Sequence, residues 1–249
     1  MRVDTSKKDS IIAMIPARTG SKRLPLKNLS LLNGRPLISY AVEAAKDANI
    51  FDRIVINSES RIFEKIANRY GVDFYKRLPK LASSQAKSDD VVYDFVKNNP
   101  CDIVVWVNPT SPLQAGQDLR KIVTYFIHQK LDSLITVKNE QVHCLYQAKP
   151  LNFEMEQIFS RTQDLVPVQL FVYSAMMWKA GLFMKTFREK GHAVFSGKVG
   201  FYPVGRLSSV IIKNQNDLML AESLLKIIKS DKKYEVKYDK LAKLAKQFK

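Results

Sequence analysis

The stretch Ile11-Ile-Ala-Met-Ile-Pro-Ala-Arg-Thr-Gly-Ser-Lys-Arg-Leu-Pro-Leu-Lys-Asn28 decides the fold that we expect. Its apolar start, Ile11 to Ile15, is typical of a buried strand. The loop after it holds one glycine, one serine and four cations, which are Arg18, Lys22, Arg23 and Lys27. Backbone N–H groups near Gly20 and Ser21 can point at phosphate oxygens, and long cations can neutralise them. The loop therefore favours an anion site, although a solvated basic loop is about as common after a strand. Its spacing matches neither the P-loop nor the dinucleotide fingerprint.

Outward from this stretch, predicted strands alternate with predicted helices. Strands are expected at 53–57, 72–75, 103–107, 133–137, 170–173 and 200–204. Helices are expected from Pro36, over 62–70 with Gly71 as the end, from Ser88-Asp89-Asp90 through Phe95, from 112–117 through Ile127, and over 217–229. This alternation predicts an α/β, Rossmann-like fold with a mainly parallel sheet that is covered on both faces. In such folds ligands bind at the carboxyl ends of the strands.

The chain divides into a predicted α/β domain, 1–229, and a basic C-terminal tail, 230–249. Periodicity weakens from Asn139 to about Leu165, where Lys149-Pro-Leu-Asn is expected to form a turn. For the tail, a solvated lysine-rich helix is favoured over a role at a membrane surface.

The net charge of +16 has three explanations. No recognition helix, RNP-type motif or zinc finger supports nucleic acid as the partner. A small polyanion such as a nucleoside triphosphate explains the cations of the loop. A lysine-rich surface bias explains the remainder.

Cysteines, histidines and hydropathy exclude several classes of protein. Cys101 and Cys144 suggest neither a disulfide scaffold nor a zinc site, and three histidines show no ligand spacing. There is no apolar run of about 18 residues and no signal-peptide pattern at the start. We therefore expect no integral membrane segment and a cytoplasmic location.

The motif Pro-Ala-Arg-x-Gly-Ser-Lys-Arg-x-x-x-Lys-Asn closely resembles the opening motif of the sugar-acid cytidylyltransferases, among them the acylneuraminate cytidylyltransferases. The resemblance is strong up to the Asn108 loop and weak afterwards. It implies the three-layer fold of the nucleotide-diphospho-sugar transferases. It also implies that Arg18, Lys22 and Lys27 hold the phosphates of CTP, and that Gly20, Ser21 and Asn28 contact the nucleotide. Arg23 reads equally well as a solvent-exposed charge.

Two further segments resemble the family. Arg77-Leu-Pro-Lys-Leu-Ala-Ser-Ser-Gln-Ala-Lys-Ser-Asp-Asp90 implies that Arg77 and Ser88 lie around cytosine and ribose, although Ser88 also fits a helix N-cap. Ser84 stands where the family usually has an aspartate. Asn108-Pro-Thr-Ser-Pro-Leu-Gln114 resembles Gln-Pro-Thr-Ser-Pro-Leu-Arg, so that Asn108, Thr110 and Ser111 are expected at the sugar acid and Gln114 lacks the usual charge.

Later family positions are altered. Gln169 aligns with an asparagine that meets the substrate, and Tyr146 aligns with a lysine. Counting back from Asp217-Leu-Met-Leu-Ala-Glu222 puts Ile211 and Lys213 where the family has two aspartates that ligate magnesium. Magnesium requires oxygen ligands, which neither residue provides. Either Mg²⁺ is held mainly by CTP and water, or the Lys213 ammonium replaces part of the charge of the metal, or the chain binds without catalysis.

The resemblance implies a nucleotidyltransferase that transfers CMP from CTP to a 2-keto sugar acid and releases pyrophosphate. A catalytically impaired nucleotide- or sugar-binding homologue is the main alternative, and a different transfer on the same fold is another. The family inserts a protruding segment that packs on a second subunit. We therefore expect 139–165, with its large apolar residues, to form the interface of a homodimer.

Overall fold

The computed structural model describes residues 9–230, 235–239 and 241. The strands are β1 (Ile11–Pro16), β2 (Leu31–Leu32), β3 (Arg35–Pro36), β4 (Arg53–Ser58), β5 (Asp73–Lys76), β6 (Ile103–Val107), β7 (Ser133–Glu140), β8 (Leu145–Tyr146), β9 (Lys149–Pro150), β10 (Val168–Lys179) and β11 (Val199–Pro203). The α-helices are α1 (Leu37–Ala48), α2 (Ile62–Tyr70), α3 (Ser88–Asn98), α4 (Gly116–His128), α5 (Ala180–Lys190) and α6 (Gln215–Lys229). Short 3₁₀ helices are η1 (Lys27–Leu29), η2 (Pro79–Ala82) and η3 (Thr162–Asp164).

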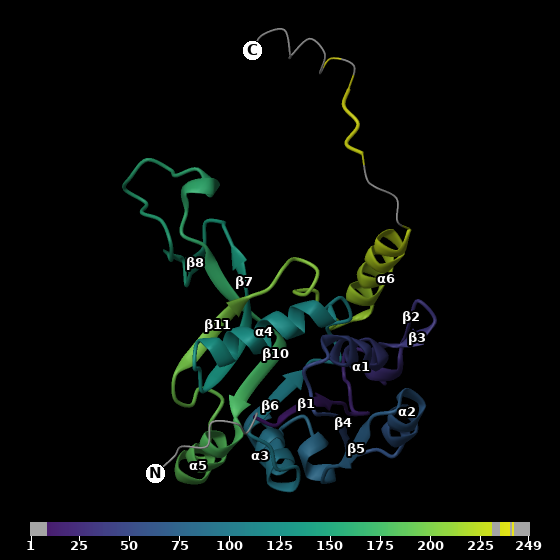
Figure 1. The fold of residues 1–249 in the computed structure, drawn as a ribbon. Helices are drawn as coiled ribbons and strands as arrows, with labels where there is room; N and C mark the ends of the chain where they lie inside the picture. Colours follow the sequence, from purple (N-terminus) through teal and green to yellow (C-terminus); the bar gives the residue numbers. More distant parts are fainter. Residues whose placement is uncertain (1–8, 231–234, 240, 242–249) are drawn as a thin grey trace.

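A seven-stranded sheet in the order β11-β7-β10-β6-β1-β4-β5 forms the centre of the molecule (Figure 1). Strands β6, β1, β4 and β5 run parallel to one another, and β11 runs parallel to β7. Strand β10 is antiparallel to both of its neighbours, β6 and β7. The expected mixed α/β fold with a mainly parallel sheet is therefore confirmed, with β10 as the exception.

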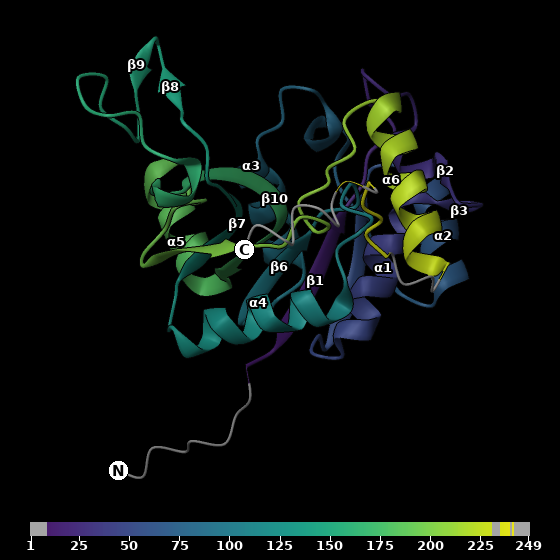
Figure 2. The ribbon, with the colours of Figure 1, turned by 90° about the horizontal axis from the view of Figure 1, so that it is seen from above.

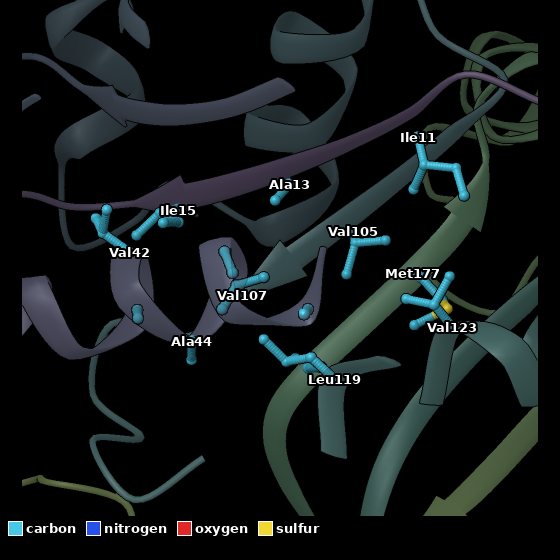
Figure 3. Close-up of a cluster of buried hydrophobic side chains, with 14 of the residues drawn as sticks. Ile11, Ala13, Ile15, Val42, Ala44, Val105, Val107, Leu119, Val123 and Met177 are labelled. Carbon is cyan, nitrogen blue, oxygen red and sulfur yellow. The ribbon is translucent and has the colours of Figure 1, made fainter. Parts of the chain in front are cut away.

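Helices cover both faces of this sheet, which explains why β1 is buried along its whole length. Successive side chains of a strand point to opposite faces. Ile11, Ala13 and Ile15 pack in one cluster with α1, α2 and α4, and Figure 3 shows part of that cluster. Ile12 and Met14 pack in another cluster with α3 and α5. Figure 2 shows α1 and α4 on one side of the strands and α3 on the other.

Most helix boundaries follow the signals in the sequence. Helix α2 has the expected bounds, and Gly71 ends it with a φ of 59°, a conformation that glycine adopts easily. Ser88, however, is the first residue of α3 rather than its N-cap, which is Lys87. Helix α4 begins only at Gly116, because the two prolines before it keep the chain extended or turned.

Residues 141–167 leave the body of the molecule as an arm between β7 and β10, with the β8–β9 hairpin in it (Figures 1 and 2). The turn that we expected at Lys149 lies earlier, because Gln147 and Ala148 take positive φ values of 49° and 61° and Lys149 belongs to β9. Two positive φ values in a two-residue loop match the twist of a hairpin. Glycine and asparagine usually mark such turns, which explains why Gln-Ala was overlooked.

Of the predicted tail, the structure describes 230, 235–239 and 241. None of these is helical, and the rest of that prediction lies outside the described residues. In the described part of the chain no helix is long and apolar enough to cross a membrane. Cys101 and Cys144 are both free thiols.

Candidate active site

A cavity of about 760 Å³ opens where β1 and β6 end. Its lining comes from the ends of β1 and β6 with the loops after them, from Arg77 after β5, from η2 to the first turn of α3, from the middle of β10 and from the α5–β11 loop. The carboxyl ends of parallel strands are where α/β folds bind ligands. This cavity is therefore the candidate site.

The loop after β1 crosses one side of the cavity. Arg18 lines the cavity, and its Nη1 donates to the carbonyl oxygen of Ser83 at 2.8 Å. A guanidinium has five N–H donors, so donors remain for an anion. Contrary to expectation, the Ser21 N–H is engaged by the carbonyl oxygen of Thr19 at 3.0 Å. A Cβ at Gly20 would meet no atom within 4 Å, so this loop leaves open space beside its glycine.

Beneath this loop, Arg77 and Glu59 form a buried bracket. The Nη2 atom of Arg77 donates to the Ala17 carbonyl at 2.8 Å and lies 3.4 Å from Glu59 Oε2. The N–H and hydroxyl of Thr19 both donate to Glu59 Oε1 at 2.8 Å. Burial opposes the ionisation of Glu59, but these Thr19 hydrogen bonds and Arg77 outweigh it and lower its pKa. The bracket therefore fixes the position of the loop. Arg77 is buried, and it also lines the cavity.

Lys27 reaches the C-terminal part of the chain. Its Nζ donates to the Ile212 carbonyl at 2.8 Å, and Ile212 N–H donates to the Thr110 carbonyl at 2.8 Å. Burial, followed by the nearby cations Arg23 and Arg18, lowers the pKa of Lys27. Asn28 beside it is buried, and its Oδ1 has no hydrogen-bond partner among the described residues. An unpartnered buried oxygen at a cavity wall suits a ligand that donates a hydrogen bond.

In the loop after β6, the amide of Asn108 is occupied by its own surroundings. Asn108 Nδ2 donates to the Tyr173 carbonyl at 3.0 Å, and Oδ1 accepts from the N–H and the hydroxyl of Thr110 at 2.9 and 2.8 Å. Asn108 therefore positions the loop against β10. Ser111 and Gln114 are buried in the same loop, outside the cavity lining, with side-chain polar atoms that lack partners in the described chain.

The opposite wall of the cavity is aromatic and was not predicted. Tyr173 and Phe195 line it, and both rings contact Phe171, at centroid distances of 5.6 and 6.2 Å. Tyr173 has a φ of 54°, which is unusual for a bulky residue, and the register of β10 against β7 shifts between Phe171 and Met176. This bulge turns the Tyr173 side chain toward the cavity. No motif in the sequence marks such an irregularity.

The α5–β11 loop brings His192 and Phe195 to the same wall. Asp89 Oδ1, in the first turn of α3, accepts from the N–H groups of Ala193 and Val194 at 2.5 and 3.0 Å. The carboxylate thus anchors a loop that lies about a hundred residues later in the chain.

The structure therefore gathers only some of the predicted residues. The predicted residues that line the cavity are Arg18, Ser21, Lys27, Asn28, Arg77, Ser88, Asn108 and Thr110. Those that do not line it are Gly20, Lys22, Ser111 and Gln169. Gln169 lies on β10 at the base of the arm, where its Nε2 donates to Asn139 Oδ1 at 3.1 Å.

The residues at the site do not fit a magnesium ion held by the protein. Mg²⁺ requires oxygen ligands in octahedral geometry. In the described chain no group of three or more His, Cys, Asp or Glu side chains that could hold a metal is found. Asp89 is the only carboxylate in the described lining, and one of its oxygens is used by the α5–β11 loop.

Solved structures show which known fold the chain has. The fold matches that of CMP:2-keto-3-deoxy-manno-octonic acid synthetase complexed with CTP, with a TM-score of 0.67, 12% identity and coverage of 88% of this chain and 99% of the other. It also matches 4-diphosphocytidyl-2C-methyl-D-erythritol synthase from Anaerococcus prevotii, with a TM-score of 0.64, 14% identity and coverage of 88% and 96%. The fold is that of the CTP-dependent nucleotidyltransferases.

The sequence gives the family. The profile of the cytidylyltransferase family matches residues 12–177, and the chain belongs to this family. The N-acylneuraminate cytidylyltransferase of Oncorhynchus mykiss is 32% identical over 135 residues, which are 54% of this chain and 31% of the relative. That of Escherichia coli is 35% identical over 121 residues, 47% of this chain and 28% of the relative. The chain thus matches about a third of the length of these relatives.

Proposed function

We propose that the protein transfers CMP from CTP to a 2-keto sugar acid and releases pyrophosphate. The observation that carries this proposal is the cavity at the carboxyl ends of β1 and β6, which Arg18, Lys27, Arg77 and the η2–α3 loop line together. Membership of the cytidylyltransferase family and relatives named N-acylneuraminate cytidylyltransferase support the same reaction.

In the proposed reaction, the anomeric hydroxyl oxygen of the acceptor attacks the α-phosphorus of CTP in line. The bond from the α-phosphorus to the oxygen that bridges to the β-phosphorus breaks, pyrophosphate leaves with the electron pair of that bond, and the proton of the hydroxyl passes to water. Negative charge grows on the leaving group, so cations fixed beside it lower the barrier. Arg18 and Lys27 have this role, and the open space at Gly20 lets the phosphates approach the loop.

The two walls of the cavity suggest how the substrates are divided. The polar wall with Arg18, Asn28 and Arg77 suits the nucleotide. The aromatic wall with Tyr173 and Phe195 suits the acceptor, because an aromatic ring packs well against the apolar face of a sugar. Asn108 and Thr110 lie between the two walls. Their hydrogen bonds hold the loop after β6 in place beneath the reacting atoms.

The direct test is to incubate the purified protein with CTP and a panel of 2-keto sugar acids and to measure pyrophosphate release. We expect release with CTP and at least one nonulosonic or octulosonic acid, and none with ATP. An Arg18→Ala variant is the control for release by a contaminant. Binding of CTP without release for every acceptor would favour the alternative, a nucleotide-binding homologue, which the loss of the two metal aspartates at Ile211 and Lys213 supports.

We also propose that the protein is a homodimer whose interface includes the arm. The exposed apolar side chains of the arm support this, since Ile158 and Phe159 are 94% and 72% exposed. Such surface is normally covered by a partner. Light scattering at micromolar protein is expected to give twice the mass of the chain, and Ile158→Asp to give a monomer. A monomeric wild-type protein would contradict the proposal.

A further inference from the structure

Residues 211–213 join the loop after β1 to the loop after β6 at the end of the cavity that Lys27 lines. We call it the phosphate end, because the proposed function puts the triphosphate there. Ile212 is fully buried, and its two backbone polar groups bind one loop each. Its N–H donates to Thr110 in the loop after β6, and its carbonyl accepts from Lys27 in the loop after β1. The backbone of Lys213, the next residue, is therefore held close to the ammonium of Lys27.

The backbone of Lys213 is fixed, whereas its side chain is free. Its N–H donates to Asp217 Oδ2 at 2.7 Å, and the same oxygen accepts from Asn214 N–H at 2.9 Å. Asp217 is thus used as the capping carboxylate of α6. The Lys213 side chain is exposed, and its ammonium makes no hydrogen bond or ion pair with another described residue.

The charges around Lys27 are unbalanced. Arg23, Arg18 and Lys213 all act to lower its pKa, after burial, and Asp217 is the one carboxylate that acts to raise it. These neighbouring positive charges repel one another in the free protein. A triphosphate would relieve this repulsion, whereas a divalent cation at the same place would increase it.

We infer that Lys213, together with Lys27, supplies the positive charge at the phosphate end of the cavity, so that the protein binds CTP without a metal ion held by its own side chains. The inference rests on the proposed function, since it assigns the triphosphate to this end of the cavity. Lys213 lies outside the cavity lining described above, and a four-carbon side chain has the reach to close over bound phosphates.

Calorimetric titration of CTP into the whole protein tests the inference, once in excess EDTA and once in excess MgCl₂. We expect CTP to bind in EDTA at least as tightly as in MgCl₂. We expect Lys213→Ala to weaken binding in EDTA by about tenfold, the scale of one charge-assisted hydrogen bond, and Lys213→Arg to restore most of it. Lys121→Ala, which removes an exposed lysine on α4, is the matched control and should change nothing.

A second measurement does not depend on CTP affinity. The probe is Mn²⁺, whose free fraction is read by electron paramagnetic resonance in the presence of CTP. Wild-type protein should not increase the amount of Mn²⁺ bound beyond that bound by CTP alone, whereas Lys213→Asp should, because it adds an oxygen ligand beside Asp217.

The outcomes separate the inference from the proposed function. Binding of CTP that requires MgCl₂, or unchanged affinity in Lys213→Ala, overturns the inference and leaves the cytidylyltransferase proposal standing. Failure of the wild-type protein to bind CTP under either condition overturns both. Thermal melting of each variant shows that it is folded.

Discussion

The two walls of the cavity differ in chemistry and in how they are held. The wall built from the loop after β1 and the η2–α3 loop is polar, and hydrogen bonds from Arg77 to the Ala17 carbonyl and Glu59, and from Arg18 to the Ser83 carbonyl, fix it. The wall built from β10 and the α5–β11 loop is aromatic and half-exposed, with Tyr173 and Phe195 exposed by 44% and 58%. The first wall holds segments whose sequence resembles the family motifs, whereas Tyr173 and Phe195 lie in the later part of the chain, where the resemblance is weak.

This contrast supports the proposed division of the two substrates between the walls. A wall that is rigid and matched to the family motif suits a ligand common to the family, such as the nucleotide. The second wall is made of a strand bulge and a loop, and among the described residues the polar contacts of that loop with α3 all go to the Asp89 carboxylate. Such a wall suits a ligand that differs between members of the family. The predictions below test the contrast, beginning with the largest expected effect.

Arg77→Ala should destabilise the polar wall most. The substitution leaves the Ala17 carbonyl and the partly buried Glu59 carboxylate without the buried Arg77 guanidinium, and breaking such a pair costs about 3 kcal/mol in free energy of unfolding. Arg53→Ala is the matched control, because its ion pair with Asp73 at 2.8 Å is exposed and should contribute less than about 1 kcal/mol. Urea denaturation measures both, and equal losses would contradict the role of the bracket.

Arg18→Ala should weaken CTP binding by about 1.5–3 kcal/mol, since it removes a charge-assisted donor from the phosphate end. Arg69→Ala, on the exposed face of α2, removes the same charge away from the cavity and should leave affinity unchanged. Calorimetry provides the measurement. An unaltered CTP affinity in folded Arg18→Ala protein would remove this loop from the nucleotide site.

Phe195→Ala should act on the acceptor alone. Loss of about 1 kcal/mol of aromatic contact raises the KM for the sugar acid about fivefold while the affinity for CTP stays the same. Phe201→Ala is the control, because Phe201 stacks on Phe171 in the same cluster, at 5.7 Å, but does not line the cavity. Steady-state kinetics with each substrate varied in turn would show the split, and a change in CTP affinity would contradict the division of the two walls.

The smallest expected effect is the uptake of a proton by Lys27 when CTP binds. Burial and neighbouring cations lower the pKa of Lys27 in the free protein. Some of the Lys27 side chains are therefore neutral as the pH approaches this lowered pKa. Phosphate oxygens favour the ammonium form and raise the pKa again, so CTP binding should be accompanied by proton uptake at alkaline pH. Calorimetry in buffers of different ionisation enthalpy measures the uptake. Lys27→Met should abolish it, and an identical uptake in that variant would assign the proton to another group.

The parts of the fold with a regular period could be predicted from the sequence. Strand β6 and helix α2 have the expected bounds, because a continuous apolar run and a helical stripe ending in Gly71 leave few alternatives. The loop after β1 was also recognisable, since its cations follow a buried strand. Of the residues predicted in this stretch, Arg18, Ser21, Lys27 and Asn28 do line the cavity.

The aromatic wall could not be predicted, for a physical reason. The side-chain period of a strand gives the face of each residue only while the register holds, and β10 shifts register between Phe171 and Met176. Gln169, which the resemblance implied at the acceptor, lies before this shift, at the base of the arm and outside the cavity lining. His192 and Phe195 reach the site through Asp89, a contact between distant residues that no local pattern encodes.

The bond between Lys27 Nζ and the Ile212 carbonyl joins residues that are 185 positions apart in the chain. During synthesis the first strand and its basic loop leave the ribosome long before their partner, because a chain grows from its N-terminus. Until Ile212 follows, Lys27 lacks its carbonyl acceptor and the Thr110 loop lacks its N–H donor. The Lys27–Ile212–Thr110 connection is consequently one of the last parts of the domain to be completed, and the proposed nucleotide site is complete only in a chain whose translation has passed that residue.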